Sequence, residues 1–176
     1  MSKNMERWDI YDADKNKTGR TMIRNDFPMK DGDYHLSVLG IVTDGKGRFL
    51  ITQRKADKAW APLSWEVSGG GVQAGETSEQ AVRREVSEET GLKLDGADII
   101  FMSSYRSEGG PDHNNYFEDI YQVRLDFTPE DVHIQASETE NFRICGLNDV
   151  MLLGENGKFL HYERLLPVME EIGTES

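Results

Sequence analysis

The stretch GGGVQAGETSEQAVRREVSEETGL, from Gly69 to Leu92, decides how this sequence is interpreted. Thr77 followed three residues later by Gln80 has the form of a capping box, and Gly91 suits the position just past a helix end. The segment between these signals, SEQAVRREVSEET, contains neither glycine nor proline. The pattern therefore predicts a helix over residues 78–90, of about three and a half turns.

The glutamates of this helix do not occupy an ordinary solvated face. At about 100° per residue, Val82 and Val86 define the buried side, and Glu85, Glu88 and Glu89 fall along its edge. Three like charges placed there repel one another and lose hydration unless a cation neutralises them. A hard divalent cation such as Mg²⁺ binds clustered oxygen ligands of this kind. Geometry alone leaves two interpretations open, a metal site or a wet cleft lined by unbound acids.

The spacing of the stretch carries more information than the helix alone. It fits the pattern G-x5-E-x7-R-E-U-x-E-E-x-G-U, where U is a bulky aliphatic residue. The fixed positions are Gly70, Glu76, Arg84, Glu85, Val86, Glu88, Glu89, Gly91 and Leu92. The stretch resembles the Nudix box, the signature of the Nudix hydrolases, and no fixed position departs from it. The resemblance implies an α/β/α sandwich with a mixed β-sheet.

Composition sets the broad class of the protein. The 176 residues suit one domain, 1–176, with its own core. The net charge of -12 argues against a surface for nucleic acid or an anionic membrane, although local cations can still hold a phosphorylated substrate. No apolar run approaches the ~20 residues of a membrane span, and the N-terminus lacks the apolar segment of a signal peptide. A single cysteine, Cys145, excludes an internal disulfide and favours a cytoplasmic location.

Strand and helix patterns are mixed along the chain, which predicts an α/β fold with a mixed sheet. Residues 109–114 are expected to form a loop, and Pro167 is expected to kink or restart a helix over residues 161–172. Residues 63–70 are expected to form a short strand that enters a glycine-rich loop. The other expected strands are two short ones within 7–24, a hairpin of 36–42 and 49–52, and strands within 92–108, 114–127 and 141–147.

The family resemblance implies roles for the charged residues of the box. Glu85, Glu88 and Glu89 would coordinate one or more Mg²⁺ or Mn²⁺ ions, which would hold a substrate diphosphate and lower the pKa of the attacking water. Arg84 would orient a box carboxylate, and Glu88 one turn further on is within its reach. Spacing alone fits an exposed, solubilising Arg84 nearly as well. Glu76 would fix the loop or support the metal ligands.

Other residues are candidates for binding the substrate. Gly69, Gly70 and Gly71 would let the backbone bend close to a ligand. Arg54 and Lys55, at the end of the FLITQR strand, are candidate phosphate contacts, and the alternative is a solvated strand end.

The general base lies outside the box, and the sequence leaves two candidates. Glu138, in ASETENF, resembles a loop glutamate that approaches the metals in many relatives, and it is preferred over Glu118, in NYFEDIY. The alternative for either residue is simple exposure to solvent. Trp60 and Trp65 are candidates for stacking on a base, although core packing is the commoner fate of tryptophan.

A second resemblance introduces a competing function. The segments ERWDIYDADKNKTGR and GDYHLSVLGIV are similar to the N-terminal half of isopentenyl-diphosphate isomerase and related hydrolases. The isomerases use a cysteine followed by a histidine metal ligand near the WEVSGG segment, where this chain has neither. Cys145 lies far away in the sequence, and His35 alone cannot rebuild that site. A non-catalytic Nudix-fold binding module is a third possibility, but such a module is expected to lose box carboxylates.

These observations predict a metal-dependent hydrolase that cleaves a diphosphate linkage in a nucleoside diphosphate derivative. Water would attack a phosphorus atom in line. The expected partner is a small diphosphate molecule, and dimers are common in the family.

Overall fold

The structure is a computed structural model that describes residues 5–174. Its strands are β1 (Arg7–Tyr11), β2 (Lys17–Ile23), β3 (His35–Thr43), β4 (Phe49–Arg54), β5 (Trp65–Glu66), β6 (Ser68–Gly71), β7 (Asp98–Ser107), β8 (Tyr116–Arg124) and β9 (Thr139–Cys145). Its helices are α1 (Ser78–Thr90), α2 (Leu147–Glu155) and α3 (Tyr162–Thr174). Six strands thus precede α1, three follow it, and two helices end the described chain, so strands and helices are mixed as the sequence predicts.

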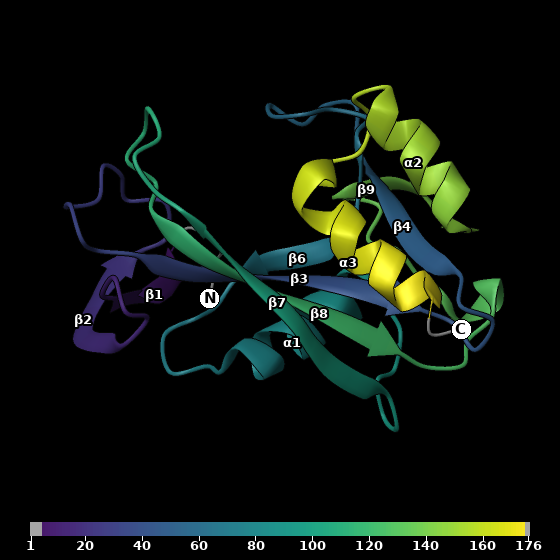
Figure 1. Ribbon diagram of the computed structural model, residues 1–176, viewed down its shortest axis with the longest axis horizontal. Coiled ribbons are helices and arrows are strands. Elements are labelled where there is room, and N and C mark those ends of the chain that lie inside the picture. The colour runs from purple at the N-terminus through teal and green to yellow at the C-terminus, as the bar shows by residue number, and fades with distance from the viewer. Residues whose placement is uncertain (1–4, 175–176) are drawn as a thin grey trace.

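Seven strands form one mixed sheet with helices on both faces (Figure 1). The order is β5-β4-β3-β8-β7, with β6 paired to β3 and β9 paired to β4. The long β3 and β8 run parallel, whereas β3 pairs with β4 and β6 in the antiparallel direction. This arrangement confirms the predicted α/β sandwich with a mixed sheet.

Helix α1 has the bounds that its capping signals predict. The Thr77 side chain accepts a hydrogen bond from the Gln80 amide at 3.1 Å, and the Gln80 side chain accepts one from the Thr77 amide at 2.9 Å. At the other end, Gly91 adopts a left-handed conformation with φ of 71°. Because both ends are fixed locally, the glutamates of α1 take defined positions.

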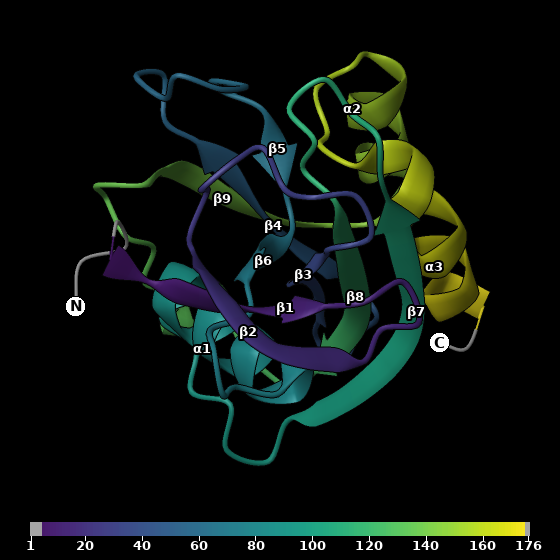
Figure 2. The same cartoon turned by 90° about the vertical axis from the view of Figure 1, so that its left-hand side faces the viewer.

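The central strand β3 contributes to a core on each face of the sheet. Val38 and Val42 pack in the core that contains α1, whereas Leu39 and Ile41 pack in the core that contains α2 and α3. This alternation follows from the two-residue period of a strand. Figure 2 shows α1 on one side of the sheet and α2 and α3 on the other.

Gly40 allows α1 to approach β3 closely. A Cβ atom at this position would lie 2.8 Å from Val82 Cγ2 and 2.9 Å from Val86 Cγ2. We expect Gly40→Ala to lower the free energy of unfolding by about 1–3 kcal/mol, because α1 must shift or strain. In urea denaturation, Gly40→Ala combined with Val82→Ala should be less destabilised than the sum of the single variants. Strict additivity would show that the close approach is not what Gly40 provides.

The small sheet of β1 and β2 packs across one end of β3. Tyr11 and Tyr34 exchange backbone hydrogen bonds of 2.8 and 2.9 Å, which join β1 to the start of β3. Trp8 of β1 stacks on His35 of β3 with ring centroids 4.2 Å apart. The N-terminal hairpin thus forms one wall of the cleft described below.

Three local predictions differ from the structure. The glycine-rich segment expected to be a loop is strand β6, because its residues pair with β3 from Ser37 to Gly40. Helix α2 has no counterpart among the predicted elements. Pro167 lies inside α3 and does not divide it, since Leu165, Val168 and Met169 bury that helix face. Packing of an amphipathic face can outweigh one lost backbone hydrogen bond.

The sequence predicts a single domain over residues 1–176. Residues 1–4 and 175–176 of this range lie outside the described residues. Within the described part of the chain, no helix combines the length and the apolar composition needed to cross a membrane.

Candidate active site

A cleft of about 650 Å³ lies where α1, β5, β6, the β4–β5 loop and the N-terminal hairpin meet. Carboxylates are its most frequent charged groups. They come from Glu66, Glu85, Glu89, Glu118 and Glu138. The structure thus brings both candidate bases to the same cleft as two glutamates of α1.

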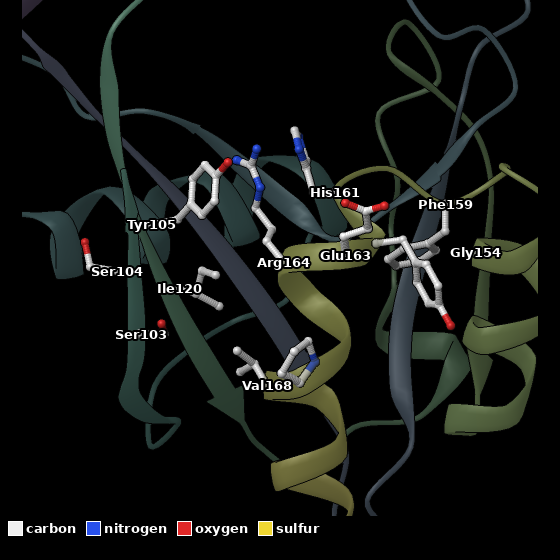
Figure 3. A pocket seen from close by; sticks show the side chains of 12 residues that line it. Ser103, Ser104, Tyr105, Ile120, Gly154, Phe159, His161, Glu163, Arg164 and Val168 are labelled. Atoms are coloured by element: carbon white, nitrogen blue, oxygen red, sulfur yellow. The ribbon is translucent and has the colours of Figure 1, made fainter. Parts of the chain in front are cut away.

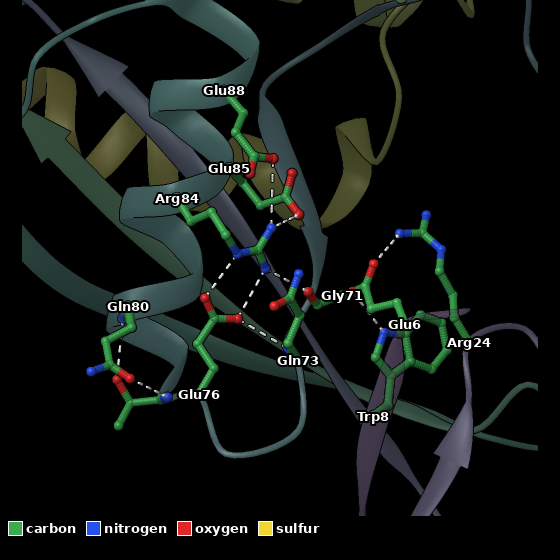
Figure 4. A network of polar contacts seen from close by, with 11 residues as sticks. Glu6, Trp8, Arg24, Gly71, Gln73, Glu76, Gln80, Arg84, Glu85 and Glu88 are labelled. Carbon is green, nitrogen blue, oxygen red and sulfur yellow. Dashed lines mark hydrogen bonds and ion pairs between the residues drawn. The ribbon is translucent and has the colours of Figure 1, made fainter. Parts of the chain in front are cut away.

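Arg84 is held by several acceptors at the edge of this cleft (Figure 4). Its guanidinium donates to both oxygens of Glu76 at 2.8 and 2.9 Å, to Glu85 Oε1 at 2.8 Å and to the Gly71 carbonyl at 3.1 Å. Burial alone would raise the pKa of Glu76, but the hydrogen bonds from Arg84 and the Gln73 amide lower it overall. Arg84 therefore holds Glu85 Oε1, and Glu76 binds both Arg84 and the Gln73 amide of the loop.

The position of Glu88 is different from that of its neighbours. Its side chain is 44% exposed, its Oε2 lies 3.7 Å from Arg84 Nη1, and it is not among the described residues that line the cleft. The structure therefore brings together Glu85 and Glu89, whereas Glu88 stays at the rim. Its role as a metal ligand stays a prediction.

Glu85 and Glu89 form a close carboxylate pair on the inner side of α1. Burial raises the pKa of Glu89 well above its ordinary value, and the nearby charges of Glu85 and Glu66 raise it further. The Gly69 amide donates to Glu89 and partly opposes this shift. Burial also raises the pKa of Glu66. The site therefore places buried carboxylates close enough together to disfavour the charged form of Glu89.

This donor set fits a hard divalent cation. Within residues 5–174, no three carboxylate, imidazole or thiolate side chains already stand together as a metal cage. Mg²⁺ is commonly held by one or two carboxylates, with waters and substrate phosphates as its remaining ligands. Glu85 and Glu89 can supply such a pair of oxygen ligands, and a cation there would relieve their repulsion.

The glycines of β6 are required by close contacts, and they do not bend the chain. A Cβ at Gly70 would lie 2.3 Å from Glu85 Oε1 and 2.5 Å from its Cδ. A Cβ at Gly71 would lie 2.5–2.8 Å from the Trp8 ring. Gly70 thus leaves the space that the Glu85 carboxylate occupies. Gly70 and Gly71 both line the cleft, and their role in substrate binding stays a prediction.

The basic residues of the cleft wall are paired with acids or with backbone groups. Arg54 Nη1 lies 3.5 Å from Glu66 Oε1, and Lys58 pairs with Glu138. Lys55, the other predicted phosphate contact, instead donates to the Ala136 carbonyl at 2.8 Å. Arg54 and Lys58 are therefore the cations of the β4–β5 region that line the cleft.

The two candidate bases have different surroundings. Glu118, on β8, is buried, and its oxygens accept from Ser37 Oγ at 3.1 Å and from Arg164 Nη1 at 2.7 Å. The Glu138 side chain is 45% exposed and precedes β9. Glu118 is thus fixed in place, whereas Glu138 is accessible to water.

His35 lines the cleft as a buried, uncharged group. Burial lowers its pKa from 6.5 to about 4, although the hydrogen bond between Nε2 and Asn114 Oδ1, 2.7 Å long, opposes the shift. In this site it cannot supply a charge at neutral pH.

The low pKa of His35 predicts a pH-dependent stability. Between about pH 6.5 and 4, His35 binds a proton in the unfolded chain but not in the native state. Acidification through this window therefore destabilises the protein. We expect the difference in unfolding free energy between wild type and His35→Gln to shrink by about 3 kcal/mol over this window. Urea denaturation at a series of pH values measures it. If the unfolding free energies of the two proteins changed in parallel with pH, the lowered pKa of His35 would be contradicted.

The structure does not restore the chemistry of the isomerase. Cys145 is buried on β9, outside the residues that line the cleft, and burial raises its thiol pKa to about 11. The WEVSGG segment, near which the isomerases carry their cysteine and histidine, contributes Val67, Gly69 and Gly70 to the cleft. The cleft thus lacks that catalytic pair among the described residues.

The two candidate stacking tryptophans have opposite fates. Trp65 is 6% exposed and packs in the core, whereas Trp60 is 60% exposed and lines the cleft.

His161, at the start of α3, lines both this cleft and a second cavity of about 680 Å³ between β7 and α3 (Figure 3).

Sequence reasoning missed Glu66 and His161 as residues of the cleft. Glu66 stands alone between Trp65 and Val67, with no spacing that relates it to the box. Strand β5 brings it there by pairing Glu66 with Thr52 of β4. No local sequence pattern reveals this pairing, or the position that His161 takes just before α3.

Comparisons with known proteins agree with this geometry. A family model described as NUDIX domain matches residues 33–165. The protein "Uncharacterized Nudix hydrolase lmo0368" of Listeria monocytogenes is 32% identical over 159 residues, which cover 90% of this chain and 90% of the relative. "Nucleoside triphosphatase NudI" of an Enterobacter species is 39% identical over 105 residues, 58% of this chain and 73% of that protein. The crystal structure of DR0079 from Deinococcus radiodurans superposes with a TM-score of 0.68 at 23% identity, covering 87% and 91% of the two chains.

Proposed function

The chain belongs to the NUDIX domain family and is a hydrolase, and from that premise we propose that it cleaves a diphosphate linkage in a nucleoside diphosphate derivative with the help of Mg²⁺ or Mn²⁺. The observation that carries this proposal is the Glu85–Glu89 pair. Two carboxylates, one of them with a strongly raised pKa, face a cleft beside basic side chains. Such a pair is best explained by a cation that normally neutralises it.

Each group of the cleft has a part in the proposed reaction. Glu85 and Glu89 hold the cation, Arg84 keeps Glu85 in position, and Arg54 and Lys58 contact the substrate phosphates. When bound, the cation polarises the phosphoryl group and makes water a stronger nucleophile. The diphosphate itself adds oxygen ligands, so two protein carboxylates are sufficient to begin the site.

We retain Glu138 as the general base. A base must receive a proton from water and later release it, and the half-exposed Glu138 side chain has access to solvent. Glu118 has both oxygens occupied by donors, which suits a structural or orienting role better. Glu88 would contribute from the rim of the site.

A nucleoside in the substrate is supported by relatives and by the cleft. The similar NudI protein is named a nucleoside triphosphatase, and a diphosphate linkage is part of any nucleoside triphosphate. The cleft also contains an exposed tryptophan, which a purely inorganic or aliphatic diphosphate would not require.

A screen of diphosphate compounds tests the proposal. We expect phosphate to be released with Mg²⁺ or Mn²⁺, either directly or after addition of a phosphatase, and to disappear with a chelator. Zn²⁺ should serve poorly, because a site of carboxylates lacks the nitrogen and sulfur ligands it favours. Full activity in the presence of a chelator would refute the proposed metal dependence. Compounds that bind but stay intact across the panel would indicate a binding module instead.

A further inference from the structure

The β4–β5 loop, residues 55–64, presents Trp60 at the mouth of the cleft. We propose that Trp60 is the platform on which the planar base of the substrate stacks, with the His161 ring as the facing wall. This inference rests on the proposed hydrolysis of nucleoside diphosphate derivatives and adds the residue that recognises the group attached to the diphosphate.

Trp60 is the aromatic side chain of the cleft with a ring surface open to a ligand. Four described aromatic side chains line the cleft: Trp8, His35, Trp60 and His161. Trp8 and His35 are buried and stack on each other, so neither offers a face. Trp60 is 60% exposed although tryptophan is usually well buried, as Trp65 is in the adjoining strand. The loop therefore keeps a large apolar ring at the edge of a polar cleft.

The backbone around Trp60 is held in this conformation. Arg54 Nε donates to the Trp60 carbonyl at 3.2 Å, and the Leu63 amide donates to the Arg54 carbonyl at 3.2 Å. Ala61 and Leu63 both have positive φ, 47° and 61°, which side-chain-bearing residues rarely adopt. Such conformations persist only where the surroundings impose them. The exposure of Trp60 is thus a built feature of the loop.

A short series of side chains connects Trp60 with the carboxylate pair. The Arg54 guanidinium lies 5.2 Å from the centre of the Trp60 ring, and its Nη1 lies 3.5 Å from Glu66 Oε1. The charge of Glu66 in turn acts on Glu89. Arg54 and Glu66 thus link the platform to the side of the cleft that holds the proposed metal ligand. A molecule with a diphosphate at one end and a planar ring at the other matches this arrangement.

The distance between Trp60 and His161 is close to what a clamp requires. Their ring centroids are 6.5 Å apart, with an interplanar angle of 37°. A planar ring in van der Waals contact on both sides needs about 7 Å, twice the ~3.5 Å carbon–carbon contact distance. A small movement of the loop and alignment of the rings would accommodate a base between them.

Binding of products tests the platform without relying on turnover. Isothermal titration calorimetry would compare adenosine 5′-monophosphate with ribose 5-phosphate, which lacks the base, for wild type, Trp60→Phe, Trp60→Ala and Leu63→Ala. Leu63 is the matched control, because it is exposed on the same loop and does not line the cleft. We expect wild type to prefer the nucleotide about 10-fold, since stacking one base on an aromatic side chain commonly contributes about 5- to 150-fold.

The variants separate stacking from a general effect on the loop. Trp60→Phe and Leu63→Ala should keep most of the preference, and Trp60→Ala should lose it while binding ribose 5-phosphate normally. No preference in wild type, no measurable binding of the nucleotide, or an unchanged preference in Trp60→Ala would overturn the inference. So would a loss of self-association in Trp60→Ala with the preference intact, which would identify Trp60 as an interface between two copies of the chain.

The proposed hydrolysis is read separately on the same preparations. If the protein cleaves a diphosphate but Trp60→Ala keeps the preference for the nucleotide, only the role of Trp60 as a platform would be rejected. A preference that depends on Trp60, without cleavage of any diphosphate, would support the platform and reject the hydrolase.

Discussion

Glu89→Gln is expected to lower turnover by at least about 100-fold without unfolding the protein. Changes that only disturb the surroundings of metal ligands already cost about 10- to 100-fold, and this change removes a proposed ligand. Glu85→Gln should act in the same direction, because it removes the charge of the other member of the pair and weakens the 2.8 Å hydrogen bond that this carboxylate accepts from Arg84. Steady-state kinetics across a Mg²⁺ titration would measure both effects.

Glu89→Gln should also be more stable than wild type in the absence of metal. The native pKa of Glu89 lies above its ordinary value of 4.5, so the native state retains a proton that the unfolded chain releases. Wild type therefore loses stability as the pH rises above about 4.5, and Glu89→Gln escapes this loss. Urea denaturation without metal should show an advantage of the variant that grows with pH. Added Mg²⁺ should stabilise wild type more than the variant.

Two other glutamates of α1 complete this test. Glu79→Gln is the matched control, because Glu79 is exposed and pairs only with Arg83 in the described structure. It should leave turnover unchanged. Glu88→Gln reports on the rim position, where an intermediate loss would indicate an indirect contribution to the metal site. Near-normal turnover of Glu89→Gln and Glu85→Gln at saturating Mg²⁺ would refute the metal-site assignment.

Gly70→Ala is expected to lower turnover by about 100-fold through a single added methyl group. The new Cβ would lie 2.3 Å from Glu85 Oε1, so the carboxylate must move by about 1 Å to restore van der Waals contact. Glu85 is tied to Arg84 on one side and to Glu89 on the other, which limits where it can go. Misplacement of a reacting group by about 1 Å can cost 10²-fold in rate.

Stability and metal binding distinguish this effect from unfolding. The obstructed atoms belong to the end of a side chain, so Gly70→Ala should destabilise the fold by no more than about 1–3 kcal/mol. Gly110→Ala is the control, since a Cβ there would meet no atom within 4 Å. Titration with Mn²⁺ should show weaker binding for Gly70→Ala alone. Normal turnover and Mn²⁺ affinity in that variant would mean that the position of Glu85 is not critical.

The sequence predicts the parts of this fold that local chemistry determines. The bounds of α1 follow from Thr77, Gln80 and Gly91, and the three residues make the expected caps. The inward direction of Glu85 follows from helical periodicity. The family pattern supplies the mixed sandwich. In each case the signal lies within a few residues of the feature.

The errors arise where distant segments decide the outcome. Gly69 to Gly71 form a strand because β3 offers them backbone partners. Arg84 does lie within reach of Glu88, as its spacing predicts, but it binds Glu76 more closely because the loop before α1 folds back to it. Glu66 reaches the cleft through strand pairing alone. No sequence spacing predicts the strand pairing of Gly69 to Gly71 or the position of Glu66.

The most direct test of the account follows oxygen from water into the product. The protein would be incubated with Mg²⁺, a nucleoside diphosphate derivative identified by the screen, and water labelled with heavy oxygen, and the products would be analysed by mass spectrometry. The account predicts a nucleoside monophosphate and a phosphate-bearing fragment, one of which carries the label, and no such products with chelator or with Glu89→Gln. Isomerised isopentenyl diphosphate, or nucleotides that remain intact across a broad panel, would contradict it.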